Sequence, residues 1–85
     1  MKMIIVIIKD HDADTLTQAL TAGDYRVTRI ASTGGFLRSG VATLLLGVND
    51  ERVDSAVQLI REKLGSSGEK KATLFVVPVQ RFEQI

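Results

Sequence analysis

The chain has 85 residues, of which 45% are hydrophobic, and a formal net charge of +1. This length suits one domain, and so weak a charge excludes a general nucleic-acid binder. Because cysteine is absent, a disulfide framework and a thiolate metal site are excluded, and a reducing cytoplasm fits the composition.

The first half of the chain predicts two strands around one helix. Residues 3–8 form a continuous apolar, β-branched run, typical of a central strand buried on both faces. The run is too short for a membrane span and lacks the cleavage site of a signal peptide. Residues 10–21 predict a helix with Asp12 as its cap and Gly23 just past its end. Residues 25–33 predict a second strand and residues 34–40 a turn.

The second half of the chain repeats this pattern. Residues 41–48 are apolar and predict a third strand. Asn49 or Asp50 is expected to cap a second helix that Gly65 closes, with apolar residues at helical spacing. Residues 65–71 predict a short polar loop, residues 72–79 the last strand, and residues 80–85 a tail.

The order β-α-β-β-α-β predicts one α+β domain over residues 1–85, with the ferredoxin-like fold and its four-stranded antiparallel sheet. Two helices can cover only one face of such a sheet. Three of the expected strands are apolar at successive positions, so the second face would expose several large side chains at roughly 1.5–3 kcal/mol each. We therefore expect a closed oligomer that buries this face.

Residues 32–38 read Ser-Thr-Gly-Gly-Phe-Leu-Arg and are the clearest functional signal. Glycine pairs adopt positive φ, so successive N–H groups can converge on an anion. Phe36 and Arg38 would then supply an aromatic contact for a base and a cation. The alternative is a hairpin turn that needs glycine only for its geometry.

The second and third expected strands add to this signal. Arg26 and Thr28 alternate onto one strand face, where a guanidinium and a hydroxyl can bind a phosphate or the edge of a base. The alternative is a solvated edge strand with ordinary charges. Gly47 interrupts the third strand, which can mark a bulge or the close approach of a ligand.

The sequence favours neither a metal site nor an enzyme. His11, between Asp10 and Asp12, is better explained by a solvated helix start than by a metal site. The sequence contains neither a nucleophile-elbow pattern nor a Walker-type phosphate loop. We therefore expect no cofactor and no catalytic residue.

Several blocks together resemble the PII-like receptors for cyclic di-AMP. They are residues 1–5, 25–28, 33–38, 47–54 and 72–79, together with Phe82 and Gln84, and the resemblance extends over nearly the whole chain. It implies a homotrimeric signalling protein of the bacterial cytoplasm that binds cyclic di-AMP at clefts between subunits and acts on an unknown downstream protein. The ligand-binding residues that it implies are Arg26, Thr28, Gly35, Phe36, Leu37, Gly47, Phe75 and Gln84.

The chain departs from the family pattern at three places. Asp24 and Val41 stand where the family usually has asparagine, and valine offers neither a donor nor an acceptor. Residues 65–71 replace a longer loop. Two other readings therefore stay open: the same fold could bind another adenine nucleotide or a small anion, or the trimer could serve protein interaction without a ligand.

Overall fold

The computed structural model describes residues 1–30, 40–65 and 70–85. The elements along the chain are β1 (Lys2–Lys9), α1 (Asp10–Ala22), β2 (Val27–Ile30), β3 (Val41–Val48), the 3₁₀ turn η1 (Asp50–Arg52), α2 (Val53–Leu64) and β4 (Ala72–Pro78). The second strand begins two residues later than predicted. Its expected last residues, 31–33, and most of the expected turn lie outside the described residues.

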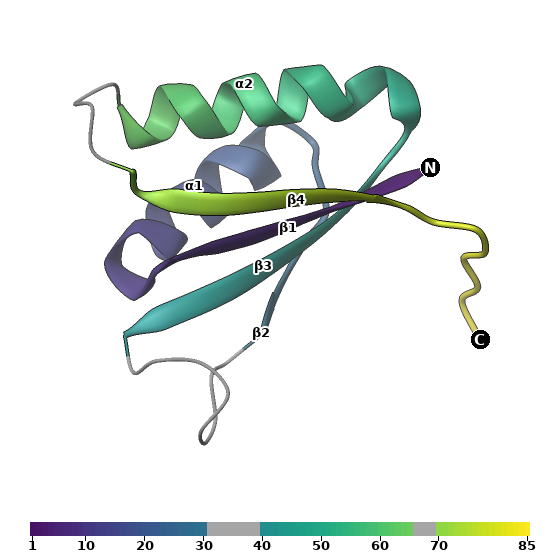
Figure 1. The fold of residues 1–85 in the computed structure, drawn as a ribbon, viewed down its shortest axis with the longest axis horizontal. Coiled ribbons are helices and arrows are strands. Elements are labelled where there is room, and N and C mark those ends of the chain that lie inside the picture. The colour runs from purple at the N-terminus through teal and green to yellow at the C-terminus, as the bar shows by residue number, and fades with distance from the viewer. Residues whose placement is uncertain (31–39, 66–69) are drawn as a thin grey trace.

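The four strands form one antiparallel sheet in the order β2-β3-β1-β4 (Figure 1). The central strand β1 places Ile5 opposite Leu45 of β3 and opposite Phe75 of β4. The backbone of Val79 donates to the carbonyl of Met1 at 3.1 Å, and beyond it the C-terminal tail runs away from the sheet. This arrangement confirms the predicted ferredoxin-like α+β fold.

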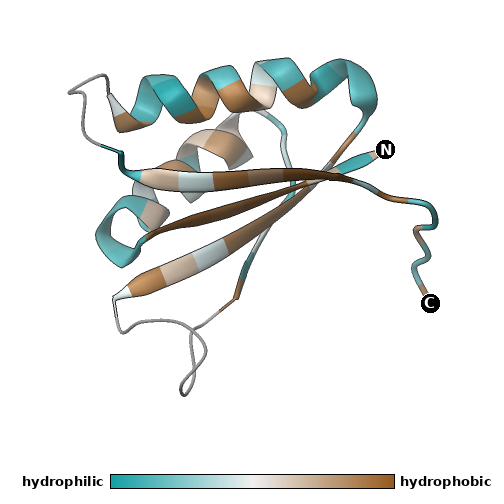
Figure 2. Cartoon of the chain, viewed as in Figure 1, coloured by the Kyte–Doolittle hydropathy of each residue, from teal (hydrophilic) through white to brown (hydrophobic). Residues whose placement is uncertain are grey.

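The core lies between one face of the sheet and the two helices. Alternate residues of β1 and β3 are buried there, among them Ile4, Val6 and Leu44, each fully enclosed. Leu16 and Leu20 of α1 pack against them. Figure 2 shows hydrophobic colour along the strands and hydrophilic colour on the outer sides of the helices. Strand alternation therefore divides the apolar residues between a covered face and an uncovered one.

The helix beginnings differ from the predictions. Asp12 is not a cap, because α1 already begins at Asp10, directly after β1, and Lys9 occupies the N-cap position. Asp12 instead lies in the first turn, where a carboxylate is still favourable at the positive end of the helix dipole. Asn49 precedes η1 rather than α2 and makes no side-chain capping bond. Gly23 and Gly65 end the helices as predicted, Gly65 with φ of +78°.

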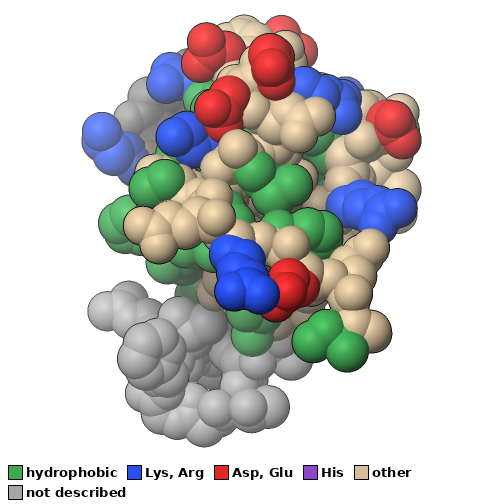
Figure 3. Space-filling view, turned by 90° about the vertical axis from the view of Figure 1, so that its right-hand side faces the viewer, with side chains coloured by type: hydrophobic (Ala, Val, Ile, Leu, Met, Phe, Trp, Pro, Cys, Tyr) green, Lys and Arg blue, Asp and Glu red, His purple; other side chains and the backbone are tan. Residues whose placement is uncertain are grey.

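Acidic side chains gather over the beginning of α2 (Figure 3). They belong to Asp50 and Glu51 of η1 and Asp54 of α2. A hydrogen bond from the Met1 amine, 3.0 Å away, and its charge lower the pKa of Asp50. Neither helix in the described part of the chain is long and apolar enough to cross a membrane.

Arg29 joins β2 to α1 on the covered side of the sheet. Its guanidinium donates hydrogen bonds to Asp14 and, at 3.3 Å, to Asp10. The hydrogen bond to Asp14, followed by the charge of Asp14 and the contact with Asp10, raises the pKa of Arg29. Arg29 therefore has structural partners in α1 and is not directed at a ligand.

Candidate functional site

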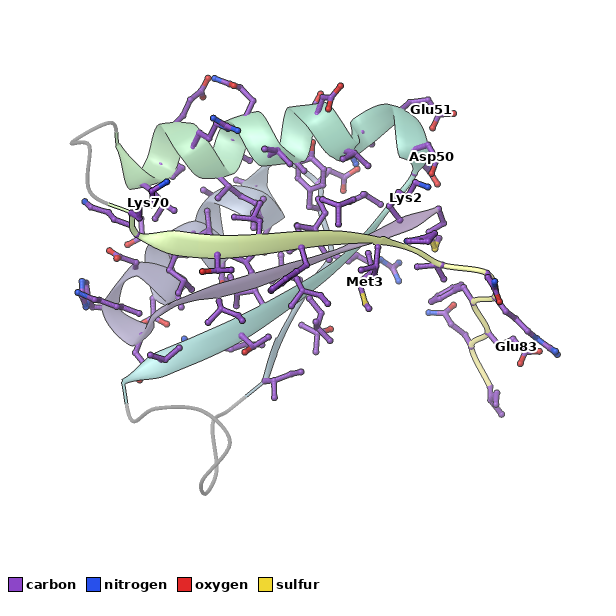
Figure 4. All side chains as sticks on the ribbon, viewed as in Figure 1. Lys2, Met3, Asp50, Glu51, Lys70 and Glu83 are labelled. Atoms are coloured by element: carbon purple, nitrogen blue, oxygen red, sulfur yellow. The ribbon has the colours of Figure 1, made fainter. Side chains whose placement is uncertain are left out.

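The face of the sheet opposite the helices is not covered by any described element of the chain. The strand register assigns to it a set of mostly apolar residues: Met3, Ile5, Ile7, Thr28, Ile30, Thr43, Leu45, Gly47, Thr73, Phe75 and Val77. Phe75 is 51% exposed and Ile30 43%. Figure 4 shows the alternation directly, with Lys2 and Met3 on opposite sides of β1. Among the described residues, β1 is therefore fully buried on one face only, and the predicted burial of its second face depends on the expected oligomer.

Three of the predicted ligand-binding residues lie together at one corner of this open face. Thr28 of β2 pairs with Leu45 of β3, so Gly47 is its diagonal neighbour, with a Cα separation of about 7–8 Å. Arg26 precedes β2 by one residue, and strand alternation directs it to the same face as Thr28. Arg26 is exposed and forms no ion pair with any described residue. A free cation, a hydroxyl and a glycine thus share one surface.

Phe75 lies on the same face but at the opposite edge. It shares a cross-strand row with Ile5, Leu45 and Thr28, and three strand spacings separate it from Thr28. That distance is roughly 14 Å, too far for one aromatic ring to contact both residues. Gln84 lies exposed in the tail, which leaves the sheet at the end where β1 pairs with Val48. Gly35, Phe36 and Leu37 lie outside the described residues.

Gly47 is not required by the packing of the chain itself. A Cβ atom added there would meet no atom within 4 Å, and its φ lies outside the left-handed region that favours glycine. In contrast, a Cβ at Gly23 would lie 3.3 Å from the ring of Tyr25. The space in front of Gly47 is therefore open to a group from outside the chain.

Arg52 holds the turn that leads into Arg26, and sequence reasoning missed it. Its guanidinium donates to the backbone carbonyls of Gly23 at 2.9 Å and Asp24 at 3.2 Å. It also lies over the ring of Tyr25, 4.0 Å from the centroid. The three contacts fix the backbone directly before Arg26 to the beginning of α2.

Asp24 and Val41, where the chain departs from the family pattern, lie in different parts of the fold. Asp24 has φ of +67°, a left-handed conformation that aspartate and asparagine both tolerate better than other side chains, so the turn geometry is preserved. Val41 begins β3, six residues from Gly47, which is roughly 20 Å along a strand. A group bound at Gly47 therefore does not reach Val41 of the same chain unless it spans the length of β3.

A groove of about 490 Å³ lies between α2 and β4, and none of the predicted ligand-binding residues that the structure describes lines it. Among the described residues, no three histidine, aspartate or glutamate side chains converge to hold a metal ion. Because one face of a sheet encloses little of a ligand by itself, Arg26, Thr28 and Gly47 need a second surface to form a binding cleft.

Comparisons with known proteins agree with this fold. The family model described as "Cyclic-di-AMP receptor" matches residues 1–71. The chain is also similar to the crystal structure of a functionally unknown protein from Pediococcus pentosaceus ATCC 25745, with 32% sequence identity and a TM-score of 0.79. The similarity covers 99% of this chain and 96% of the other.

Replacing Arg52 tests the clamp on the turn before Arg26. Arg52→Ala removes two hydrogen bonds and the contact with Tyr25, and we expect it to lower the free energy of unfolding by about 1–2 kcal/mol. The stability of Arg52→Lys, whose ammonium group lacks the planar guanidinium fork, should lie between those of the wild-type protein and Arg52→Ala. Urea denaturation followed by circular dichroism measures both, with Arg61→Ala on the exposed side of α2 as the control. A fully stable Arg52→Ala would disprove the clamp.

Proposed function

Because the chain belongs to the cyclic-di-AMP receptor family, we propose that it is a cytoplasmic signalling protein that binds cyclic di-AMP and catalyses no reaction. The observation that carries this proposal is the corner of the open face where Arg26, Thr28 and Gly47 lie together. The Arg26 guanidinium and the Thr28 hydroxyl suit a phosphate oxygen, with charge-assisted hydrogen bonds from the arginine. Gly47 admits the ligand close to the backbone.

The remaining contacts come from an aromatic residue and from the segments beyond the sheet. Phe75 is half exposed and offers its ring for stacking on an adenine, which in proteins that bind single-stranded nucleic acid contributes about 1–3 kcal/mol per base. Gln84 of the tail offers an amide to a base edge. We propose that Gly35, Phe36 and Leu37 close around the ligand from the connection between β2 and β3.

The cleft is proposed to form between subunits of a homotrimer. Two observations support this: neither helix covers the open face, and Phe75 lies roughly 14 Å from Thr28 within one chain. A neighbouring subunit would supply the missing wall and would place its own Phe75 or Gln84 nearer to Arg26. The same contact would remove the apolar residues of the open face from water.

Titration calorimetry with cyclic di-AMP, with ATP as the comparison, tests the function. We expect about one ligand per subunit and clearly weaker binding of ATP. Loss of a charge-assisted hydrogen bond in Arg26→Ala should reduce affinity at least about tenfold. Arg29→Ala is the matched control, because Arg29 occupies the same strand but is bonded to α1. Equal affinities of Arg26→Ala and Arg29→Ala for cyclic di-AMP would contradict the placement of Arg26 at the ligand. A preference for ATP would show that ATP, and not cyclic di-AMP, is the ligand.

Gly47→Ala tests the close approach of the ligand to β3. The added methyl group has free space in the chain, and the substitution restricts the unfolded state, so stability should stay level or rise by about 0.4–1 kcal/mol. Affinity for cyclic di-AMP should nevertheless fall, because the methyl group occupies the ligand's space. Calorimetry and thermal unfolding of the same sample measure both quantities. Unchanged affinity would show that the ligand does not approach Gly47.

Sedimentation of the free protein tests the trimer. We expect a particle of three chains, and we expect Ile5→Glu to dissociate it, because a carboxylate would be buried in the centre of the open face. Gln18→Glu, an exposed change on α1, is the control and should leave the trimer intact. Circular dichroism verifies that both variants fold. A monomeric wild-type protein would contradict the shared cleft.

A further inference from the structure

A groove on the helix side of the sheet lies apart from the proposed ligand site. It runs between α2 and the edge strand β4 and has a volume of about 490 Å³. Its apolar walls come from Val57, Ile60 and Leu64 of α2 and from Leu74 and Val76 of β4. Val76 remains 44% exposed. The groove is therefore an apolar surface that the fold itself leaves partly open.

One end of this groove is strongly basic. Arg61, Lys70 and Lys71 line it together with the apolar residues, and none of the described lining residues is acidic. Lys9 meets the two lysines in an adjoining hollow. None of these four side chains forms an ion pair with a described residue. A further hollow places Asp12 beside Lys9, Lys70 and Lys71, so the basic end carries an excess of positive charge that this one carboxylate offsets only in part.

The opposite end of α2 has the opposite sign. Figure 4 shows Lys70 at one end of the α2–β4 pair and Asp50 and Glu51 at the other. In Figure 3, acidic side chains gather at the top of the surface, over the beginning of α2. An elongated partner with acidic groups at one end would thus be attracted in one orientation and repelled in the other.

The groove adjoins a free strand edge. β4 is the last strand in the order β2-β3-β1-β4 and pairs only with β1 among the described strands. Its outer N–H and C=O groups are therefore available to an added strand. In such an addition the backbone supplies affinity, while pockets for alternate side chains supply specificity.

From the apolar groove, its basic end and the free edge of β4, we propose that the α2–β4 groove docks an extended segment of a partner protein. The segment pairs with the outer edge of β4 and places apolar side chains at alternate positions in the groove. Its aspartate or glutamate residues meet Arg61, Lys70 and Lys71. This surface uses Leu74 and Val76 of β4, whereas the proposed ligand site uses Phe75 on the other face. The two proposals therefore rest on opposite faces of β4, and the test of docking does not require cyclic di-AMP to bind.

Selection from a displayed library of random 12-residue peptides, on the full-length protein, tests this surface. We expect the enriched peptides to combine alternating apolar residues with acidic residues at one end. Synthetic copies should protect the amides of β4 from hydrogen exchange. Arg61→Glu/Lys71→Glu should weaken them about tenfold or more in fluorescence anisotropy, because attraction becomes repulsion. Lys63→Glu/Arg81→Glu makes the same change in net charge outside the groove and should leave the affinity unchanged.

Three results would overturn the proposal. One is that enriched peptides carry no acidic bias or bind the two double variants equally well. Another is that no peptide is enriched that protects β4. The third is that Arg61→Glu/Lys71→Glu changes the sedimenting mass of the free protein, because the groove would then be an interface between copies of this chain. Repeating the anisotropy measurement with the protein saturated by cyclic di-AMP shows whether the ligand site works in the same sample. A failure of the groove to bind peptide is then distinguished from a failure of the ligand site.

Discussion

The structure depends on one constraint: the sheet is apolar on both faces, but the two helices cover only one of them. α1 and α2 bury Ile4, Val6 and their neighbours completely, but no helix among the described residues covers Ile5 or Phe75 on the other side. Burial of large apolar side chains is worth roughly 1.5–3 kcal/mol each, so the open face favours association. The proposed ligand site lies on that same face, which links binding to assembly.

The alternation of side chains along β2 decides which charged residues stabilise the fold and which remain available to a ligand. Arg26 and Arg29 are three residues apart and therefore point to opposite faces of the sheet. Arg29 meets Asp10 and Asp14 of α1, whereas Arg26 has no partner among the described ion pairs. A shift of one residue in the pairing of β2 would exchange these roles and place an unpaired cation against the covered face.

The sequence predicted the elements well, because apolar runs and glycine ends are local signals. The predicted helix began at residue 10, as α1 does, but Asp12 was wrong as its cap, because Lys9 occupies the N-cap position. Sequence reasoning also missed Arg52, whose carbonyl partners lie 28 and 29 residues earlier and belong to no motif. Alternation was enough to group Arg26 with Thr28, but only the strand order revealed that Phe75 lies at the far edge.

β4 connects the two surfaces on which the proposed functions depend. Phe75 faces the open side, while Leu74 and Val76 on either side of it face the α2 groove. A ligand influences a partner only if it binds two conformations of the shared element with different affinity. β4 can supply such an element, because it is held by β1 on one edge and is free on the other. A shift that improves the contact of Phe75 with a base would move both groove residues, and the coupling would act equally in the reverse direction.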